Sequence, residues 1–199
     1  MKLRNWDDLY KKIGPLRYQS SESDCVPTTL VNGLTVLFER RLNPKLLQLI
    51  WGLSLDREHE TGTGWVCCDV LSNLLTKWFQ RAYEDKYEKK QLPFTSRIIE
   101  GDSVHLGRSN PILRCLNSGG VVCLSTADHY YLIVGVDEDE DFLVFDCWWD
   151  EIKTPGQLEK LGSYNGLVNT RWTRGHLQKI LGKYRWVHLL SKTGGSNAP

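Results

Sequence analysis

Apolar residues in the first part of the chain recur with the spacing of helices. Over residues 27–41 they return every three or four positions, which places them on one face of a helix. Pro27 suits the first turn, because a proline lacks the N–H that would be unpaired there. The same spacing predicts a short helix after Pro44 and a third helix from about Val66 to beyond Phe79, with residues 54–65 as the loop between them.

After Pro93 the pattern changes to short apolar runs that are typical of strands. Strands are predicted at residues 95–99, 121–125, 129–136, 141–149 and 184–190. The acidic residues 137–141 lie between two of these runs, and this predicts a hairpin. Two further helices are expected, one that starts at Asn110-Pro111 and ends at Gly119-Gly120, and one over residues 174–181.

Helical patterns fill most of the first half of the chain and strand patterns most of the second half. This order predicts an α+β fold with an antiparallel sheet. A length of 199 residues suits one domain, residues 1–199. Within it we expect a helical lobe at about 15–92 and a sheet lobe at about 93–191, followed by a flexible tail at 192–199.

Charge and composition narrow the classes of function. The net charge is +1, so no electrostatic attraction to nucleic acid or to an anionic membrane is expected. No run approaches the ~20 apolar residues of a membrane span, and the N-terminus lacks the apolar segment of a signal peptide. We therefore expect a cytoplasmic protein whose six cysteines stay reduced. These cysteines lack zinc-site spacing, and no metal or cofactor is predicted.

Cys25 stands at the start of the first long helix. The N-terminus of a helix stabilises an anion, and the thiolate is the reactive form of cysteine. Such a nucleophile needs a base, which in turn needs an orienting group. His129 opens one strand of the predicted hairpin and Asp146 closes the apolar run of the other, so both are expected at the same end of the sheet. Taken singly, each residue also fits an ordinary structural role, as a buried thiol, a strand edge or a turn.

Gln19, six residues before Cys25, is the fourth candidate. Its amide is able to donate a hydrogen bond to the oxyanion of an acyl-transfer intermediate, beside the backbone N–H of Cys25. An isolated glutamine in a loop is otherwise an ordinary surface residue. Among the eight tryptophans, Trp148 and Trp65 are candidates to line a substrate cleft, with burial in the core as the alternative.

Together these features resemble the papain-like cysteine peptidases, and within them the bacteriocin-processing (double-glycine) peptidases and their stand-alone relatives. The matching motifs are residues 18–34 (YQSSESDCVPTTLVNGL), residues 128–146 (DHYYLIVGVDEDEDFLVFD) and, less closely, residues 118–131 (SGGVVCLSTADHYY). The resemblance implies a papain-like fold, with the nucleophile at a helix N-terminus packed against the sheet. It implies Cys25 as nucleophile, His129 as base and acid, Asp146 as its orienting partner, and Gln19 as oxyanion donor.

The expected function is therefore that of a cysteine hydrolase acting on a peptide or amide substrate. Two alternatives stay open at this point. Acyltransferases of the phytochelatin synthase-like type use the same four residue types but pass the acyl group to an amine. A papain-like module that binds without catalysis is the third reading. The sequence indicates neither the acceptor, whether water or amine, nor the oligomeric state.

Overall fold

The structure is a computed structural model that describes residues 4–54, 63, 94–107, 110–126, 129–148, 166–183 and 186–192. The helices are α1 (Trp6–Ile13), α2 (Cys25–Phe38), α3 (Pro44–Ser54), α5 (Pro111–Asn117) and α6 (Arg174–Lys183), with a 3-10 turn η1 (Gly101–Ser103). The strands are β1 (Phe94–Glu100), β2 (Val121–Ser125), β3 (Tyr130–Val136), β4 (Phe142–Phe145), β5 (Thr170–Trp172) and β6 (Trp186–Lys192). The described part of the chain is thus an α+β fold.

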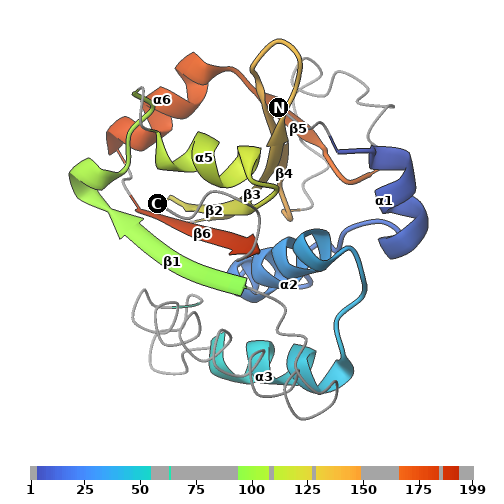
Figure 1. Cartoon of the computed structure of the whole chain (residues 1–199). Helices are drawn as coiled ribbons and strands as arrows, with labels where there is room; N and C mark the ends of the chain where they lie inside the picture. Colours follow the sequence, from blue (N-terminus) through green and yellow to red (C-terminus); the bar gives the residue numbers. More distant parts are fainter. Residues whose placement is uncertain are drawn as a thin grey trace.

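The six strands form one antiparallel sheet in the order β1-β6-β2-β3-β4-β5 (Figure 1). Hairpins connect β2 to β3 and β3 to β4, so three consecutive strands lie side by side. The pairing of β3 with β4 ends at Leu132 and Phe145. The segment before β3 and the segment after β4 therefore leave the sheet at the same end, which is where His129 and Asp146 lie.

Each face of the sheet is covered by helices, because successive side chains of a strand point to opposite faces. Val121 and Cys123 of β2 pack in the cluster that contains the apolar residues of α2 and α3. Val122 and Leu124 of the same strand pack in a second cluster with residues of α5 and α6. The helix that begins with the candidate nucleophile therefore lies directly on the sheet that carries the candidate base.

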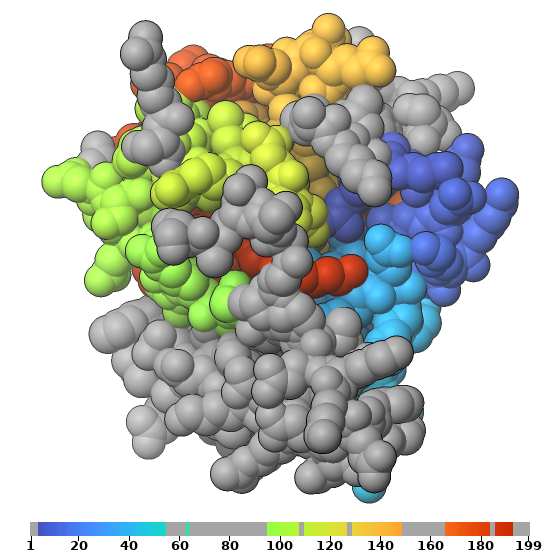
Figure 2. Space-filling model, in the orientation of Figure 1, coloured from blue at the N-terminus to red at the C-terminus, as the bar shows by residue number. Residues whose placement is uncertain are grey.

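The N-terminal segment is held against the rest of the molecule by core packing and by hydrogen bonds. Leu9 and Ile13 of α1 are buried in the core cluster that contains α2. Arg4 donates hydrogen bonds from Nη2 to the carbonyl oxygens of Gly119 (2.6 Å) and Gly120 (3.0 Å). Figure 2 shows this segment in blue on the right side of the surface, opposite the green surface of the β1 region. The chain that leads to Gln19 and Cys25 thus starts from a fixed point.

Most predicted elements are confirmed within the described residues, with shifted ends. The helix predicted at 27–41 begins at Cys25 and ends at Phe38, and the strands predicted at 95–99, 121–125 and 129–136 correspond to β1, β2 and β3. Helix α1 and strand β5 were not predicted. The predicted helix at 66–79 and most of the loop at 54–65 lie outside the described residues. No helix in the described ranges has the length and apolar character to cross a membrane.

Among the described glycines, Gly120 is the one at which an added Cβ would meet its neighbours at the shortest distances, and it supplies a test of the packing. A Cβ at this position would lie 2.5 Å from Cys115 Sγ and 2.7 Å from the Leu190 carbonyl oxygen. We predict that Gly120→Ala lowers the free energy of unfolding by about 1–3 kcal/mol, because neighbouring backbone must move. Gly52→Ala is the control: a Cβ there meets nothing within 4 Å, and alanine in a helix gains about 0.5–1 kcal/mol over glycine. Urea unfolding measures both, and equal stability of the two variants would contradict the prediction.

Candidate active site

Cys25 is the first residue of α2 and is half-buried, whereas Cys115, Cys123 and Cys147 are buried. The first N–H groups of a helix have no acceptor within the helix. Together with the helix dipole they stabilise negative charge, whether on a thiolate or on a substrate oxygen. The placement of Cys25 at the helix start, expected from the sequence, is confirmed.

The carboxylate of Asp24 folds the loop that precedes the helix. It accepts hydrogen bonds from the backbone N–H of Ser20 (3.0 Å), from Ser20 Oγ (2.8 Å) and from the backbone N–H of Ser21 (3.0 Å). Burial alone would raise the pKa of Asp24, but these hydrogen bonds to the charged form outweigh it and lower the pKa. The charged side chain therefore holds residues 20–24 in a compact turn next to Cys25.

Thr29 connects the helix of Cys25 to the strand that follows His129. Its buried hydroxyl donates a hydrogen bond to the Tyr130 carbonyl oxygen at 2.8 Å. Residues four apart lie on the same face of a helix, so Thr29 stands one turn below Cys25 on the side that meets β3. This bond sets the distance between the start of α2 and the start of β3. Nothing in the sequence around Thr29 distinguishes it from Thr28, so its role could not be predicted.

His129 and Asp146 meet at the end of the β3–β4 hairpin, as predicted from the sequence. The distance between His129 Nε2 and Asp146 Oδ1 is 2.9 Å. The same carboxylate oxygen accepts a hydrogen bond from the backbone N–H of Trp148 at 2.8 Å. Thr126 holds the other side of the turn, with its Oγ1 bound to both the N–H (3.1 Å) and the carbonyl oxygen (3.0 Å) of His129.

The imidazole of His129 also interacts with two thiols. Burial is the largest influence on its pKa and by itself would lower it. Hydrogen bonds to Asp146, Cys147 and Cys25 together outweigh burial and raise the pKa of His129 to about 12. The ring therefore carries a positive charge at neutral pH, and it is in hydrogen-bonding reach of the candidate nucleophile. Three of the four predicted catalytic residues are thus brought together.

Asn169, which precedes β5, supports Asp146 from the far side. Its Oδ1 accepts a hydrogen bond from the backbone N–H of Asp146 (2.8 Å), and its Nδ2 donates to the Asp146 carbonyl oxygen (2.7 Å). One side chain therefore satisfies both backbone groups of the residue that orients His129. Asn169 was not predicted as a site residue, since it lies 23 residues from Asp146 and the strand β5 that follows it was not predicted either.

Gln19, the fourth predicted residue, is held close to the other three through Cys147. The backbone N–H of Gln19 donates to the Cys147 carbonyl oxygen (2.9 Å), and the Cys147 thiol donates to Gln19 Oε1 (3.3 Å). Gln19 Nε2 donates to the Ser21 carbonyl oxygen at 2.9 Å. A carboxamide has two N–H groups, so this bond engages one of them. Cys147 was not a predicted site residue, because the sequence offers no reason to separate it from the other cysteines.

Of the two predicted substrate-side tryptophans, the described residues include one. Trp148 is half-buried, and its ring meets the His129 ring edge-on with the centroids 6.3 Å apart. Trp65 lies outside the described residues.

The other described histidines lie in different surroundings. His188 of β6 is fully buried, and burial lowers its pKa to about 3. His105 and His176 are exposed, so among the described histidines only His129 pairs with the candidate nucleophile.

Within the described ranges, no group of three or more His, Cys, Asp or Glu side chains is placed to hold a metal ion. A scan against models of known protein families found no match for this chain. A search of curated proteins found no significantly similar sequence. The chemistry of the site is therefore inferred from its geometry.

Replacing Thr29 tests the link between helix and sheet. Thr29→Val keeps the shape of the side chain but removes the donor to Tyr130 O, so we predict a loss of about 1–3 kcal/mol in the free energy of unfolding. Thr28→Val is the matched control. The buried Thr28 hydroxyl has no hydrogen-bond partner among the described residues, so its removal should be neutral or stabilising. Thermal and urea unfolding measure both changes, and equal effects of the two substitutions would contradict this assignment.

The protonation of His129 supplies a second test. By NMR titration, we predict that the ring stays protonated at pH 8, where an ordinary histidine with a pKa of about 6.5 is neutral. Asp146→Asn should lower the pKa of His129. Burial of the ring lowers this pKa, and the variant lacks the carboxylate whose hydrogen bond raises it. A raised folded-state pKa contributes stability that is complete below about pH 6.5 and declines as the pH rises towards about 12. The stability difference between wild type and Asp146→Asn should therefore be larger at pH 6 than at pH 9. A His129 resonance that titrates near pH 6.5 would contradict the prediction.

Proposed function

We propose that the protein is a cysteine hydrolase that cleaves a peptide or amide bond through a thioester on Cys25. One observation carries the proposal. The imidazole of His129 is hydrogen-bonded to the Asp146 carboxylate (2.9 Å), and its interaction with the Cys25 thiol contributes to its raised pKa. A nucleophile, a base and an orienting carboxylate are the three parts that this chemistry needs.

In the first half of the reaction, the Cys25 sulfur attacks the substrate carbonyl carbon and forms a C–S bond. The protonated His129 then gives its proton to the leaving nitrogen as the C–N bond breaks, and the amine departs. In the second half, His129 takes a proton from water, whose oxygen attacks the thioester carbon. The C–S bond breaks, the acid product leaves, and the thiolate and imidazolium return. Asp146 stabilises the ring whenever it is protonated, in keeping with the raised pKa of His129.

The negative oxygen of each tetrahedral intermediate needs hydrogen-bond donors. We assign this role to the backbone N–H of Cys25, at the start of α2, and to the amide of Gln19. One N–H of that amide is bound to the Ser21 carbonyl oxygen, which leaves the second N–H for the substrate. A correctly aimed donor of this kind contributes a factor of about 10²–10³ to kcat.

A papain-like arrangement is the second part of this proposal. It is supported by a nucleophile at the N-terminus of a helix that packs on an antiparallel sheet, with the base and its partner on neighbouring strands of that sheet. The four described cysteines are free thiols. Free thiols suit the reducing environment of the cytoplasm, which we propose as the location.

Selective alkylation tests the nucleophile. At pH 7, we expect iodoacetamide to modify Cys25 faster than Cys115, Cys123 and Cys147, which are buried. Burial also raises the pKa of Cys115 to about 11, so that thiol is protonated and unreactive. Peptide mass spectrometry over time measures the rates at every cysteine. Asp146→Asn should slow the reaction at Cys25, since the positive ring beside it loses its carboxylate. Equal rates at all cysteines would refute the assignment of Cys25.

Turnover is tested with a peptide library and product detection by mass spectrometry. We expect cleavage by the wild type and none above background with Cys25→Ala. Asp146→Asn should reduce kcat by up to about 10⁴-fold, because the base is then misoriented. Addition of a primary amine separates the two reaction types. A new amide in place of the free acid would identify acyl transfer, whereas release of the acid in both conditions supports hydrolysis.

A further inference from the structure

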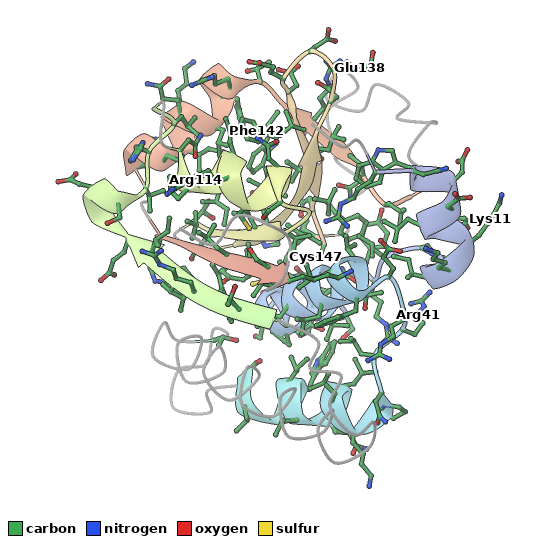
Figure 3. All side chains as sticks on the ribbon, in the orientation of Figure 1. Lys11, Arg41, Arg114, Glu138, Phe142 and Cys147 are labelled. Atoms are coloured by element: carbon green, nitrogen blue, oxygen red, sulfur yellow. The ribbon has the colours of Figure 1, made fainter. Side chains whose placement is uncertain are left out.

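Cys147 lies at the point where the candidate catalytic residues converge. Figure 3 labels it near the middle of the molecule, next to the ribbon of α2, whereas Lys11 and Glu138 point outward. Its side chain is 1% exposed, so it is removed from solvent although the residue before it, Asp146, reaches His129. A buried thiol in this position touches the catalytic residues rather than the substrate.

The Cys147 thiol has a different relation to each of its neighbours. It donates to Gln19 Oε1 at 3.3 Å, and its Sγ lies 3.4 Å from Thr29 Oγ1 and 3.7 Å from the Cys25 carbonyl oxygen. Of these three contacts, only the one to Gln19 fixes a rotatable catalytic side chain. The thiol also interacts with the His129 imidazole, but Asp146 already holds that ring. Thr29 is already bound to Tyr130 O, and the Cys25 carbonyl belongs to the helix backbone.

We propose that Cys147 is a positioning residue that aims the Gln19 amide at the oxyanion. The inference rests on the proposed function, and it assigns Cys147 a role that differs from that of nucleophile. Three contacts hold Gln19: its backbone N–H on Cys147 O, its Oε1 on Cys147 Sγ, and its Nε2 on Ser21 O. Two of the three come from Cys147. With Oε1 held by the thiol, the carboxamide cannot exchange its oxygen and nitrogen ends, so its second N–H keeps one direction.

A positioning residue is needed because the side chain of glutamine has large conformational freedom. A glutamine side chain has three rotatable bonds, and ordering it costs up to about 1.5–2 kcal/mol. An oxyanion donor contributes fully only when it is aimed before the reaction, because reorganisation during the step is then avoided. A thiol is a weak donor, but this one is buried, so water does not compete for its S–H. Loss of the thiol should therefore reduce kcat with little change in KM.

A double-mutant cycle tests the proposal on the full chain. We expect Gln19→Ala to lower kcat by about 10²–10³-fold and Cys147→Ala to lower it by about tenfold. In the Gln19→Ala background, Cys147→Ala should cause little further loss, since the group it positions is gone and Asp146 still holds the His129 ring. Cys147→Ser keeps a donor and should recover part of the activity. Cys123→Ala removes a thiol that is equally buried in the same core cluster, and it should leave kcat unchanged.

Three results would overturn the proposal. The first is an equal loss of kcat from Cys147→Ala in both backgrounds, and the second is a rise in KM with kcat unchanged. The third is a loss of kcat from Cys123→Ala equal to that from Cys147→Ala. A second measurement does not depend on turnover. In NMR spectra, the Nε2 protons of Gln19 should exchange slowly with solvent in the wild type and should exchange faster in Cys147→Ala. If wild type cleaves no peptide, the proposed function fails. The NMR result still decides the role of Cys147, and unchanged exchange of the Gln19 Nε2 protons in the variant would refute it.

Discussion

The hydrogen bond between Thr29 Oγ1 and the Tyr130 carbonyl oxygen is the contact on which the candidate site depends. It joins two segments that are 101 residues apart in the chain. The contact lies next to the candidate site. One turn of helix above Thr29 stands Cys25, and the residue before Tyr130 is His129. A thiol and an imidazole can share a proton only when their atoms are within about 3–4 Å, so the fold must fix this separation closely.

The three residues that follow β4 each make a contact that holds the candidate site together. Asp146 binds the imidazole through its side chain, Cys147 binds Gln19 through both its thiol and its carbonyl oxygen, and Trp148 returns a backbone N–H to the Asp146 carboxylate. Asn169, the residue before β5, fixes the backbone of Asp146 in this segment. Because one short segment holds both His129 and Gln19, a displacement of this segment would disturb the proposed base and the proposed oxyanion donor together. The short strand β5 pairs with β4 at this edge of the sheet and follows Asn169 directly in the chain.

The sequence predicted the elements that are long and regular, and the site residues whose chemistry is unusual. The spacing of apolar residues in α2 and the acidic turn between β3 and β4 are local signals, and they suffice to place Cys25, His129 and Asp146. The strand order was beyond such reasoning, because β6 inserts between β1 and β2 through pairings that are distant in the chain. Thr29 and Asn169 were missed for the same reason. Their importance comes from a partner on another element, and a threonine in a helix or an asparagine in a loop carries no sign of it.

Two histidines on this sheet show how partners, rather than burial, decide what a ring can do. His188 is buried beside the hydroxyl groups of Ser96 and Tyr130, and burial lowers its pKa to about 3, so it is neutral. His129 is also largely buried, yet its pKa is raised, because a carboxylate compensates the charge. A hydroxyl serves a neutral ring as well as a charged one, whereas a carboxylate favours the charged ring alone. Acid–base chemistry is therefore available at the end of the β3–β4 hairpin, where Asp146 supplies that charge, and is suppressed at His188 in the middle of the sheet.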